Sequence, residues 1–278
     1  KFLDTIKATR KPSTLERYKE ILNHFLVFYG KRWPTKRLLM EITTDHVQQF
    51  INHRSGIRDI GTVSHEAIVL GIFFNWCVKN DFIKTSPVKK VQKPQPPSKK
   101  IEYFSVDQAA RIFAAAQGTP WLDFYEFLYR SLARLREALD MKVGQIKFDR
   151  NPPVILFHNF KAGRDDEVQV ATKLLPMLKR RCKKKAPEEY LFAEIREMAR
   201  GKPLAHFKKL LRSLTPPITF GNIHTWRHTG ISHLVMPPQP VPLRIVQKLA
   251  RHQNIETTML YSHLAPDSAN GFIDNMPI

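Results

Sequence analysis

A basic, proline-rich stretch about a third of the way along the chain constrains the fold more than any other feature. The sequence "KKVQKPQPPSKKIEYF", at residues 89–104, holds three prolines and five lysines, with little apolar content before Ile101. Proline lacks a backbone donor and favours extended backbone, so this composition indicates a linker rather than a helix or strand. A chain of 278 residues is also longer than most single domains. We therefore predict one domain over residues 1–92, a linker over 93–102 and a second domain over 103–278.

Helical periodicity runs through the part before the linker. The stretch "STLERYKEILNHFLVFYG" opens with Ser13 and Glu16 at the spacing of a capping box, and Gly30 is placed to end the helix. Residues 43–54 and 63–81 have similar periodicity. Their expected inward faces are Val47, Phe50 and Ile51 in the first, and Ile68, Ile72, Phe73 and Trp76 in the second. The pattern predicts a small bundle of about four helices.

The part after the linker mixes helical and strand-like patterns. Ser105 and Gln108 are spaced to cap a helix, and residues 119–141 form one long amphipathic pattern with Pro120 in its first turn. The stretches "VILFHNF" and "EVQVA" have the pattern of strands, and the hairpin-type turn "KAGRDD" joins them. Helical patterns then return. We therefore expect a mainly α protein: an N-terminal helical domain and an α-rich second domain with a small antiparallel β-sheet.

An excess of positive charge is spread along the whole chain. Lysine and arginine number 45 against 25 acidic residues, which gives a formal net charge of +20. Residues 1–100 hold 19 basic and 8 acidic side chains, so both predicted domains are basic. Such a surface attracts polyanions, and two basic domains indicate nucleic acid as the partner. A basic protein that is merely soluble is the plainer alternative.

The sequence indicates neither a membrane nor an oxidising compartment. No apolar run is expected to span a bilayer, and no signal peptide opens the sequence. Cys77 and Cys182 lie far apart without metal-ligand spacing, which is typical of free thiols in a reducing compartment. The expected location is the cytoplasm, in association with DNA.

The stretch "IHTWRHTGISHL", at residues 223–234, gathers polar side chains that would suit a metal site, a packed helix or a catalytic pocket. His224, Arg227 and His228 fall within little more than one helical turn and therefore share one side. A zinc helix would place a glutamate between histidines four apart, and a guanidinium repels a metal cation. No glycine-rich phosphate loop is present either, so we expect no metal and no cofactor. His228 is predicted to be a packed histidine, because an apolar line follows it: Ile231, Leu234 and Val235.

Further polar residues interrupt apolar or turn segments. Arg134 and Glu137 lie in the apolar helical pattern "SLARLREALDM", where a guanidinium needs an anionic partner or a bound phosphate. Lys161 stands at the predicted hairpin tip, and Tyr261 follows His252 by nine residues. This order of arginine, lysine, His-x-x-Arg, histidine and tyrosine resembles the tyrosine recombinases, the phage-integrase family. The resemblance spans nearly the whole chain and implies a helical core-binding domain before the catalytic domain.

The resemblance implies an enzyme that breaks and rejoins DNA without metal or ATP. Tyr261 would be the nucleophile, and the product would be a 3′-phosphotyrosine with a free 5′ hydroxyl. Arg134 and Arg227 would hold the phosphate with forked donors that lysine lacks, and His252 would donate to the same phosphate. A phenol has a pKa of about 10 and needs help to lose its proton, and His224 is the expected acceptor.

Two accessory roles belong to the same boxes. Lys161 is expected to protonate the departing 5′ hydroxyl, with Lys173 or another lysine as the alternative. Glu137 is expected to orient a basic partner. Plainer interpretations exist for these residues: an Arg134–Glu137 ion pair, a solvated turn lysine, a helix-terminal His252 and a core Tyr261.

The chain departs from the family pattern at two glycines. Leu132 stands where a glycine usually lies two residues before the first arginine, and Arg251 stands where one usually precedes the late histidine. Arg251 is expected to be a further cation near the phosphate. The stretch "MPPQPVPLR" between the two histidine boxes is also longer than usual. None of these changes removes a reacting group.

Three functions stay open at this point. The first is a site-specific recombinase or integrase, as in mobile genetic elements, which acts as a tetramer on double-stranded DNA with inverted recognition arms. The second is a type IB topoisomerase-like enzyme, which uses the same chemistry without exchanging partners. The third is a non-catalytic DNA-binding protein. The order of the boxes favours the first. The partly apolar tail after Tyr261 is expected to dock on a neighbouring protomer through residues 268–278, with packing on its own domain as the alternative.

Overall fold

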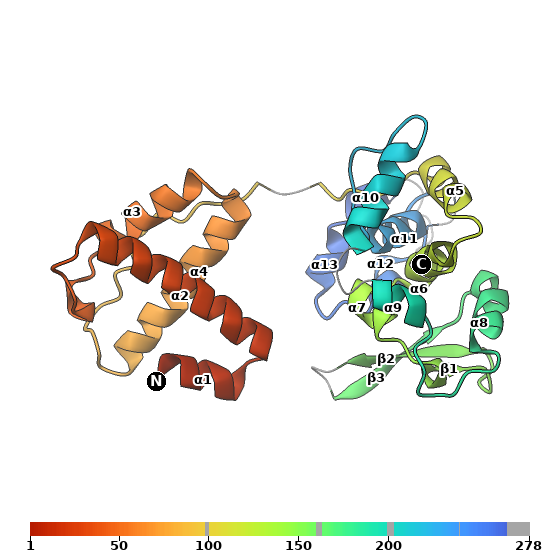
Figure 1. Cartoon of the computed structure of the whole chain (residues 1–278), viewed down its shortest axis with the longest axis horizontal. Helices are drawn as coiled ribbons and strands as arrows, with labels where there is room; N and C mark the ends of the chain where they lie inside the picture. Colours follow the sequence, from red (N-terminus) through yellow and green to blue (C-terminus); the bar gives the residue numbers. More distant parts are fainter. Residues whose placement is uncertain (98–99, 160–162, 199–202, 239, 266–278) are drawn as a thin grey trace, which may run out of the picture. The chain divides into compact units, whose positions relative to one another are not determined.

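The structure is a computed structural model that describes residues 1–97, 100–159, 163–198, 203–238 and 240–265. The chain divides into two compact units, Lys1–Lys99 and Lys100–Ile278, which Figure 1 shows. The fold class expected from the sequence is confirmed: the chain is mainly helical, with a small antiparallel sheet in the second unit. The described residues between 91 and 105 form no regular helix or strand.

The first unit is a helical bundle. Its elements are α1 (Phe2–Thr9), α2 (Pro12–Arg32), η1 (Leu39–Glu41, a short 3₁₀ helix), α3 (Thr44–Ser55) and α4 (Ile60–Lys79). The Thr43 side chain caps α3 by accepting from the His46 backbone N–H, and Asp59 caps α4 through Thr62. These caps satisfy backbone donors that the start of a helix leaves unpaired.

Helix α2 differs from its sequence prediction at both ends. It begins at Pro12, which takes the first helical position, so Ser13 lies inside the first turn and does not cap it. Gly30 does not end the helix, which continues to Arg32. A glycine ends a helix by taking left-handed backbone, and Gly30 keeps helical backbone instead. Helix α1 had no counterpart in the prediction.

The inward face of α4 also differs from its prediction. Leu70 and Phe74 are buried, whereas Ile68 and Ile72 are 48% and 39% exposed. Apolar residues nearly surround this helix, so periodicity alone does not fix which stripe packs inward. By length and composition α4 would also suffice to cross a membrane, which corrects the expectation that no such run exists. Its role in the structure is that of a core helix, with Phe74 meeting Phe25 edge to face.

The second unit combines helices with a small sheet. Its α-helices are α5 (Val106–Ala115), α6 (Pro120–Ser131), α7 (Leu135–Leu139), α8 (Leu175–Cys182), α9 (Ala193–Met198), α10 (Pro203–Ser213), α11 (Thr225–Val235), α12 (Leu243–Ala250) and α13 (Ile255–Met259). Short 3₁₀ helices are η2 (Val143–Gln145), η3 (Thr172–Leu174) and η4 (Ser262–Leu264). The capping box predicted for α5 is confirmed, because the side chains of Ser105 and Gln108 each accept from the other's backbone N–H.

The sheet has the antiparallel order β1 (Ile146–Lys147), β2 (Val154–Asn159) and β3 (Arg164–Gln169). Strands β2 and β3 form the predicted hairpin, in which Ile155 pairs with Val168. Strand β3 begins at Arg164, so residues 164–166 belong to the strand and not to the predicted turn. Ile155 and Phe157 are buried, as alternate residues of a strand that covers a core should be. Strand β1 is too short to have shown a period in the sequence.

The prediction of one long helix over residues 119–141 is wrong. Helix α6 ends at Ser131, and Leu132 takes left-handed backbone with a φ of 53°. Such backbone costs an ordinary side chain roughly 1–2 kcal/mol and suits glycine best. Arg134 then lies at the N-cap of α7 rather than inside a helix. The break turns Arg134 toward the segment after α12, where its Nη2 lies 3.5 Å from the Arg251 carbonyl oxygen.

Close packing of α11 on α6 completes the frame of the second unit. Trp226 on α11 is fully buried and stacks on Phe113 of α5. A Cβ atom added at Gly230 would overlap the carbonyl oxygen of Tyr129 on α6, so the glycine is what permits this approach. The approach brings Arg227, one turn earlier, to the break at the end of α6.

Candidate active site

Arg134 and Glu137 form an ion pair at the start of α7. Arg134 Nη1 lies 2.7 Å from Glu137 Oε1, and the Arg134 backbone N–H donates to Oε2 at 2.8 Å. The ion pair that the sequence suggested as the plainer interpretation of these two residues is therefore present. The Arg134 side chain nevertheless stays 45% exposed, so it keeps donors for another anion.

Arg227 lies in the interior and is held by backbone carbonyls. The residue is 3% exposed, and its two terminal nitrogens donate to the carbonyl oxygens of Leu132 and Ala250. Among the described residues it has no ion-pair partner. Burial, helped by the cations of Arg134 and Arg251, lowers the pKa of Arg227 to about 9. A buried cation that has only neutral partners is stabilised by a nearby anion.

Arg251 is covered by protein rather than open to a phosphate. Its side chain is 3% exposed, and its Nη2 donates to Glu137 Oε2 at 2.9 Å and to the Leu132 carbonyl oxygen at 3.0 Å. Its guanidinium carbon lies 3.7 Å from the centre of the Phe157 ring on β2. Arg251 thus lies beside the other two arginines, as a further cation of the cluster, and its guanidinium is covered by protein.

Two of the three guanidiniums contact one carboxylate, and the third shares a backbone acceptor with one of them. Arg134 and Arg251 both contact Glu137, and the Leu132 carbonyl accepts from both Arg227 and Arg251. In the part of the chain that the structure describes, no other carboxylate contacts any of the three. Burial acts to raise the pKa of Glu137, but Arg251 and Arg134 outweigh it and hold the pKa below its usual value. The cluster therefore carries more positive than negative charge.

The Tyr261 hydroxyl lies against His228. Its oxygen is 2.5 Å from His228 Nδ1, and the tyrosine is only 2% exposed. The sequence predicted a packed His228 and named His224 as the partner of the phenol. The structure brings His228 to the hydroxyl, while the exposed His224 lies behind it with ring centres 4.9 Å apart.

His252 belongs to the same cluster of charges. It follows α12, and its Nδ1 lies 2.9 Å from the hydroxyl oxygen of the buried Thr258 on α13, which fixes the ring. Burial lowers the pKa of His252 to about 4, and the cations of Arg227, Arg134 and Arg251 contribute to the shift. Arg227 donates to the carbonyl oxygen of Ala250, two residues before His252, so the segment that carries the imidazole lies against the buried arginine.

Two predicted features lie outside the described residues: Lys161 and the tail at 268–278. Lys173, the alternative to Lys161, is exposed on η3. No group of histidine, cysteine and acidic residues able to hold a metal ion occurs in the described segments.

The lowered histidine pKa values predict that acid weakens the fold. Burial and nearby positive groups lower the pKa of both His228 and His252 from 6.5 to about 4. Well above pH 6.5 both side chains are neutral whether or not the chain is folded. As the pH falls toward 4, the unfolded chain binds protons that the folded chain does not, so the free energy of unfolding decreases. We expect a loss of roughly 1–2 kcal/mol per histidine at pH 5, measured by urea denaturation.

Variants at these positions test the source of the acid sensitivity. His228→Asn and His252→Asn should each flatten the fall in unfolding free energy between pH 7 and pH 5. His65→Asn, at an exposed position of α4, is the matched control. It should leave the pH dependence of the unfolding free energy unchanged. An unchanged pH dependence in both site variants would contradict the explanation.

Two parts of the cluster were not predicted from the sequence: the His228–Tyr261 contact and the burial of Arg251. One signal was available. Leu132 and Arg251 replace the family's usual glycines, and both have positive φ, at 53° and 56°. A glycine position in a family often marks left-handed backbone, so these two departures pointed to unusual local structure.

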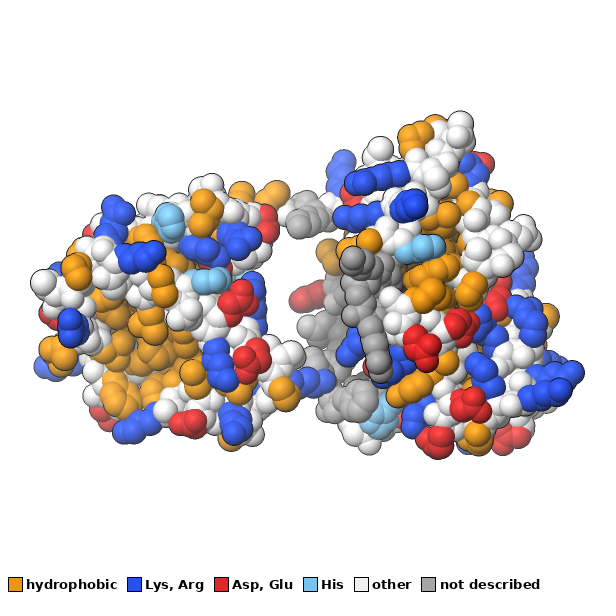
Figure 2. All heavy atoms as spheres, viewed as in Figure 1, with side chains coloured by type: hydrophobic (Ala, Val, Ile, Leu, Met, Phe, Trp, Pro, Cys, Tyr) orange, Lys and Arg blue, Asp and Glu red, His pale blue; other side chains and the backbone are white. Residues whose placement is uncertain are grey.

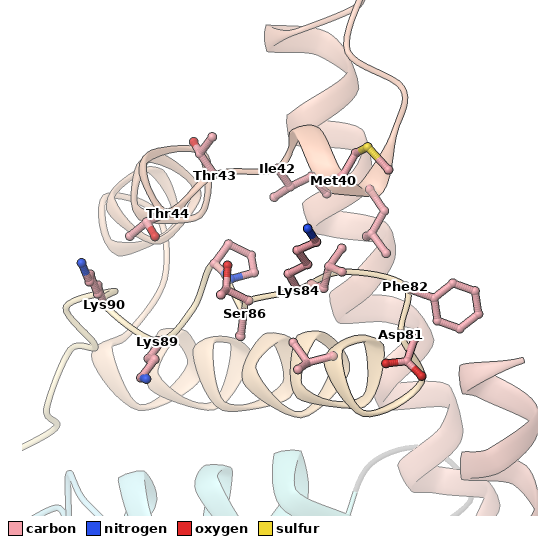
Figure 3. Close-up of a pocket in the computed structure, with 15 residues that line it drawn as sticks. Met40, Ile42, Thr43, Thr44, Asp81, Phe82, Lys84, Ser86, Lys89 and Lys90 are labelled. Carbon is pink, nitrogen blue, oxygen red and sulfur yellow. The ribbon is translucent and has the colours of Figure 1, made fainter.

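A separate pocket of about 1120 Å³ opens in the first unit, among η1, the start of α3 and the segment after α4 (Figure 3). Its lining is partly apolar and includes lysines: Met40, Ile42, Phe82, Lys84, Lys89 and Lys90. Lysine and arginine side chains are also spread over the face of each unit that Figure 2 shows. The pocket contains none of the arginine, histidine and tyrosine residues of the cluster, all of which belong to the second unit.

Comparison with known proteins identifies a family. The model of the phage integrase family matches residues 102–268, which is more than half of the chain. A tyrosine recombinase of Thermosipho africanus is 25% identical over 281 residues, covering 95% of this chain and 94% of that protein.

Solved structures agree in fold. The integrase of transposon Tn1549, in complex with a circular intermediate DNA, has a TM-score of 0.73 at 15% identity over 93% of this chain and 92% of that chain. A lambda integrase dimer bound to a COC′ core site also has a TM-score of 0.73 at 15% identity, over 92% of this chain and 94% of that one.

The cluster of Arg134, Arg227, His252 and Tyr261 lies wholly inside the region that the family model matches. The resemblance stated from the sequence boxes is confirmed. The chain therefore belongs to the phage integrase family and is an enzyme of the tyrosine recombinase class.

Proposed function

We propose that this chain is a site-specific DNA recombinase in which Tyr261 attacks a phosphodiester and the cut strand is rejoined to a new partner. The observation that carries the proposal is the excess of guanidinium charge in the same cluster as a tyrosine hydroxyl. A phosphodiester suits such a cluster, because guanidinium donors pair with its non-bridging oxygens in forked geometry. The DNA in the Tn1549 and lambda integrase complexes supports double-stranded DNA as the partner.

The reaction balances without metal, nucleotide or redox partner. The Tyr261 oxygen bonds to phosphorus while the bond from phosphorus to the 5′ oxygen breaks. The phenol releases a proton and the 5′ oxygen takes one up, for which we propose Lys161 as the donor. Arg134, Arg227 and His252 stabilise the charge that gathers on the phosphate oxygens in the transition state. The ester keeps the bond energy, so a 5′ hydroxyl can attack it and reseal the strand.

The pKa values of Tyr261 and His228 oppose proton transfer between them. Burial raises the pKa of Tyr261 to about 12, whereas burial, His224 and Arg227 lower that of His228 to about 4. A phosphate bound among the arginines would raise the histidine pKa values, and the phenol proton becomes acidic as its oxygen bonds to phosphorus. We propose that His228 accepts this proton and that His224 can receive it from His228. Attack also requires that η4 and α13 shift, because Tyr261 is almost fully covered.

Substitutions at the two histidines separate their roles. His228→Gln is expected to slow cleavage at neutral pH by roughly 10²- to 10⁴-fold, as removal of a general base does. His224→Gln is expected to have a smaller effect, because His224 does not touch the hydroxyl. Single-turnover cleavage rates measure both, with half-site binding as the control for folding. Normal cleavage by His228→Gln together with a large loss in His224→Gln would show that His224 is the acceptor.

The proposal extends to assembly on DNA. Residues 1–92 would act as a core-binding domain and residues 103–278 as the catalytic domain, with 93–102 as the linker between them. Because both units carry basic residues, we propose that each unit contacts the DNA duplex. The proposed location is the cytoplasm. We propose four protomers on two sites with inverted arms. Light scattering of the protein with full sites should give four chains for every two duplexes.

A plasmid assay tests the function against its alternatives. A recognition site is first selected from random duplexes by binding to the protein, and two copies are placed on one supercoiled plasmid. We expect exchange of the flanking segments. Relaxation of supercoils without exchange would indicate the topoisomerase-like alternative, and binding without cleavage would indicate a non-catalytic protein.

Chelation tests the metal-free mechanism in the same assay. The yield of recombinant plasmid is expected to be unchanged in EDTA and without added nucleotide, because arginines supply the positive charge that metals supply in other phosphoryl-transfer enzymes. Loss of cleavage in EDTA that a divalent ion restores would contradict it.

A further inference from the structure

Arg251 takes a backbone conformation that favours glycine. Its φ of 56° and ψ of 43° lie in the left-handed region, at the residue that ends α12. A side chain is less stable than glycine in this conformation, so its contacts have to offset that cost. The side chain is also charged and only 3% exposed, which requires hydrogen-bonding partners in the interior.

The guanidinium contacts four parts of the second unit: the break after α6, helix α7, helix α12 and strand β2. Its Nη1 donates to the carbonyl oxygens of Ser131 and Leu249 at 3.3 and 3.2 Å. Its Nη2 donates to the Leu132 carbonyl oxygen and to Glu137 Oε2. The same cation stacks over Phe157 on β2. Arg251 therefore connects the break after α6, helix α7, the end of α12 and the sheet.

These contacts reach Arg134 through Glu137. The Oε2 atom that accepts from Arg251 also accepts the Arg134 backbone N–H, and Oε1 accepts from Arg134 Nη1. Arg134 Nη2 lies 3.5 Å from the Arg251 carbonyl oxygen. Arg251 thus holds the Glu137 carboxylate, which orients Arg134. Its own backbone carbonyl also lies beside the Arg134 guanidinium.

We propose that Arg251 is a positioning residue for strand cleavage, which holds Glu137 and the turn at residues 131–134 so that Arg134 presents its exposed donors to the scissile phosphate. The inference rests on the proposed function, because it gives Arg251 a part in the same reaction. Its terminal nitrogens donate to protein oxygens and its side chain is covered, so it acts through Arg134 and not on the DNA.

Arg251→Gly tests the proposal, because glycine suits the backbone conformation and only the side chain is lost. Cleavage of a nicked suicide substrate should slow by roughly 10- to 100-fold, as when a catalytic group is misplaced by about 1 Å. Half-site affinity and its salt dependence should stay unchanged. Lys184→Gly is the matched control: Lys184 is a basic, exposed residue with a φ of 62° on the segment after α8. It should cleave at the unmodified rate.

A double-mutant cycle with Glu137→Gln tests the route from Arg251 to Arg134. If Arg251 acts through Glu137, Arg251→Gly should slow cleavage by roughly threefold or less once Glu137 is already replaced. Equal losses in the two backgrounds would overturn this route. Arg251→Lys keeps the positive charge but lacks the planar set of guanidinium donors, so it should cleave faster than Arg251→Gly but more slowly than the unmodified protein. It also replaces Arg251→Gly in the cycle if thermal unfolding shows that the glycine variant does not fold.

Two results would overturn the proposal outright. One is unmodified cleavage by Arg251→Gly. The other is a salt dependence of half-site binding that falls by about one counterion in Arg251→Gly, which would mark a direct phosphate contact. An unmodified chain that forms no covalent adduct would instead remove the proposed function, and this inference with it.

Discussion

Tyr261→Phe is expected to form no covalent adduct with a nicked suicide substrate and to bind the half-site with nearly unchanged affinity. The substitution removes one oxygen atom, the proposed nucleophile, and keeps the ring that packs in the cluster with Ile231 and Val235. Affinity for DNA comes largely from basic side chains on phosphates, which this change leaves in place. A protein–DNA band that resists denaturation in SDS reports the adduct.

The variant should also remain folded. The lost hydroxyl removes one hydrogen bond to His228 Nδ1, and such a bond contributes roughly 0.5–1.5 kcal/mol. Tyr190→Phe is the matched control, since Tyr190 lies in the same unit and outside the cluster. It should form the adduct at the unmodified rate. An adduct formed by Tyr261→Phe would contradict the assignment of the nucleophile.

Arg134→Ala and Arg227→Ala are each expected to slow cleavage by at least about 100-fold, as loss of a transition-state donor does. Their effects on stability should differ. Arg134 is 45% exposed, so its removal should leave the fold nearly intact. Arg227 is buried and donates to the carbonyl oxygens of Leu132 and Ala250. The Leu132 oxygen keeps Arg251 as a donor, whereas the Ala250 oxygen loses its side-chain partner, and a buried acceptor left unpaired costs roughly 1–3 kcal/mol. Single-turnover rates and thermal unfolding measure the two effects separately.

Lysine should replace neither arginine well, because a point charge cannot make the forked contact with phosphate oxygens. Arg134→Lys is the cleaner test, since its fold is the less affected. Arg136→Ala, at an exposed position of α7, makes the same charge change as Arg134→Ala and should cleave at close to the unmodified rate. Unmodified cleavage by both lysine variants would show that the arginines do not clamp the phosphate.

The candidate residues could be found from the sequence because each lies in a short local pattern. Their contacts could not, because they join distant segments. Glu137 and Arg251 are 114 positions apart, and Arg227 reaches Leu132 across 95. Helical periodicity reports only which residues share a face within a turn or two, so it predicted the helix of Arg227 but not the carbonyls that hold it.

The local predictions that failed have a common physical cause, which is that tertiary packing overrides weak local preferences. Leucine is a good helix former, so nothing in the segment itself marked Leu132 as the end of α6. Helix α4 is apolar on nearly every side, and its inward stripe was decided by contacts with α2 and α3. The capping box at Ser105 was predicted correctly because a cap is satisfied within its own turn.

The identity of the residue that carries the DNA tests the central claim most directly. The unmodified protein would be incubated with a nicked suicide substrate of its selected site, digested with protease and nuclease, and its modified peptide sequenced by mass spectrometry. We expect a single nucleotide-bearing peptide, with the DNA joined through its 3′ phosphate to the Tyr261 oxygen. A phosphodiester found on any other residue, or a 5′-phosphate linkage, would contradict it.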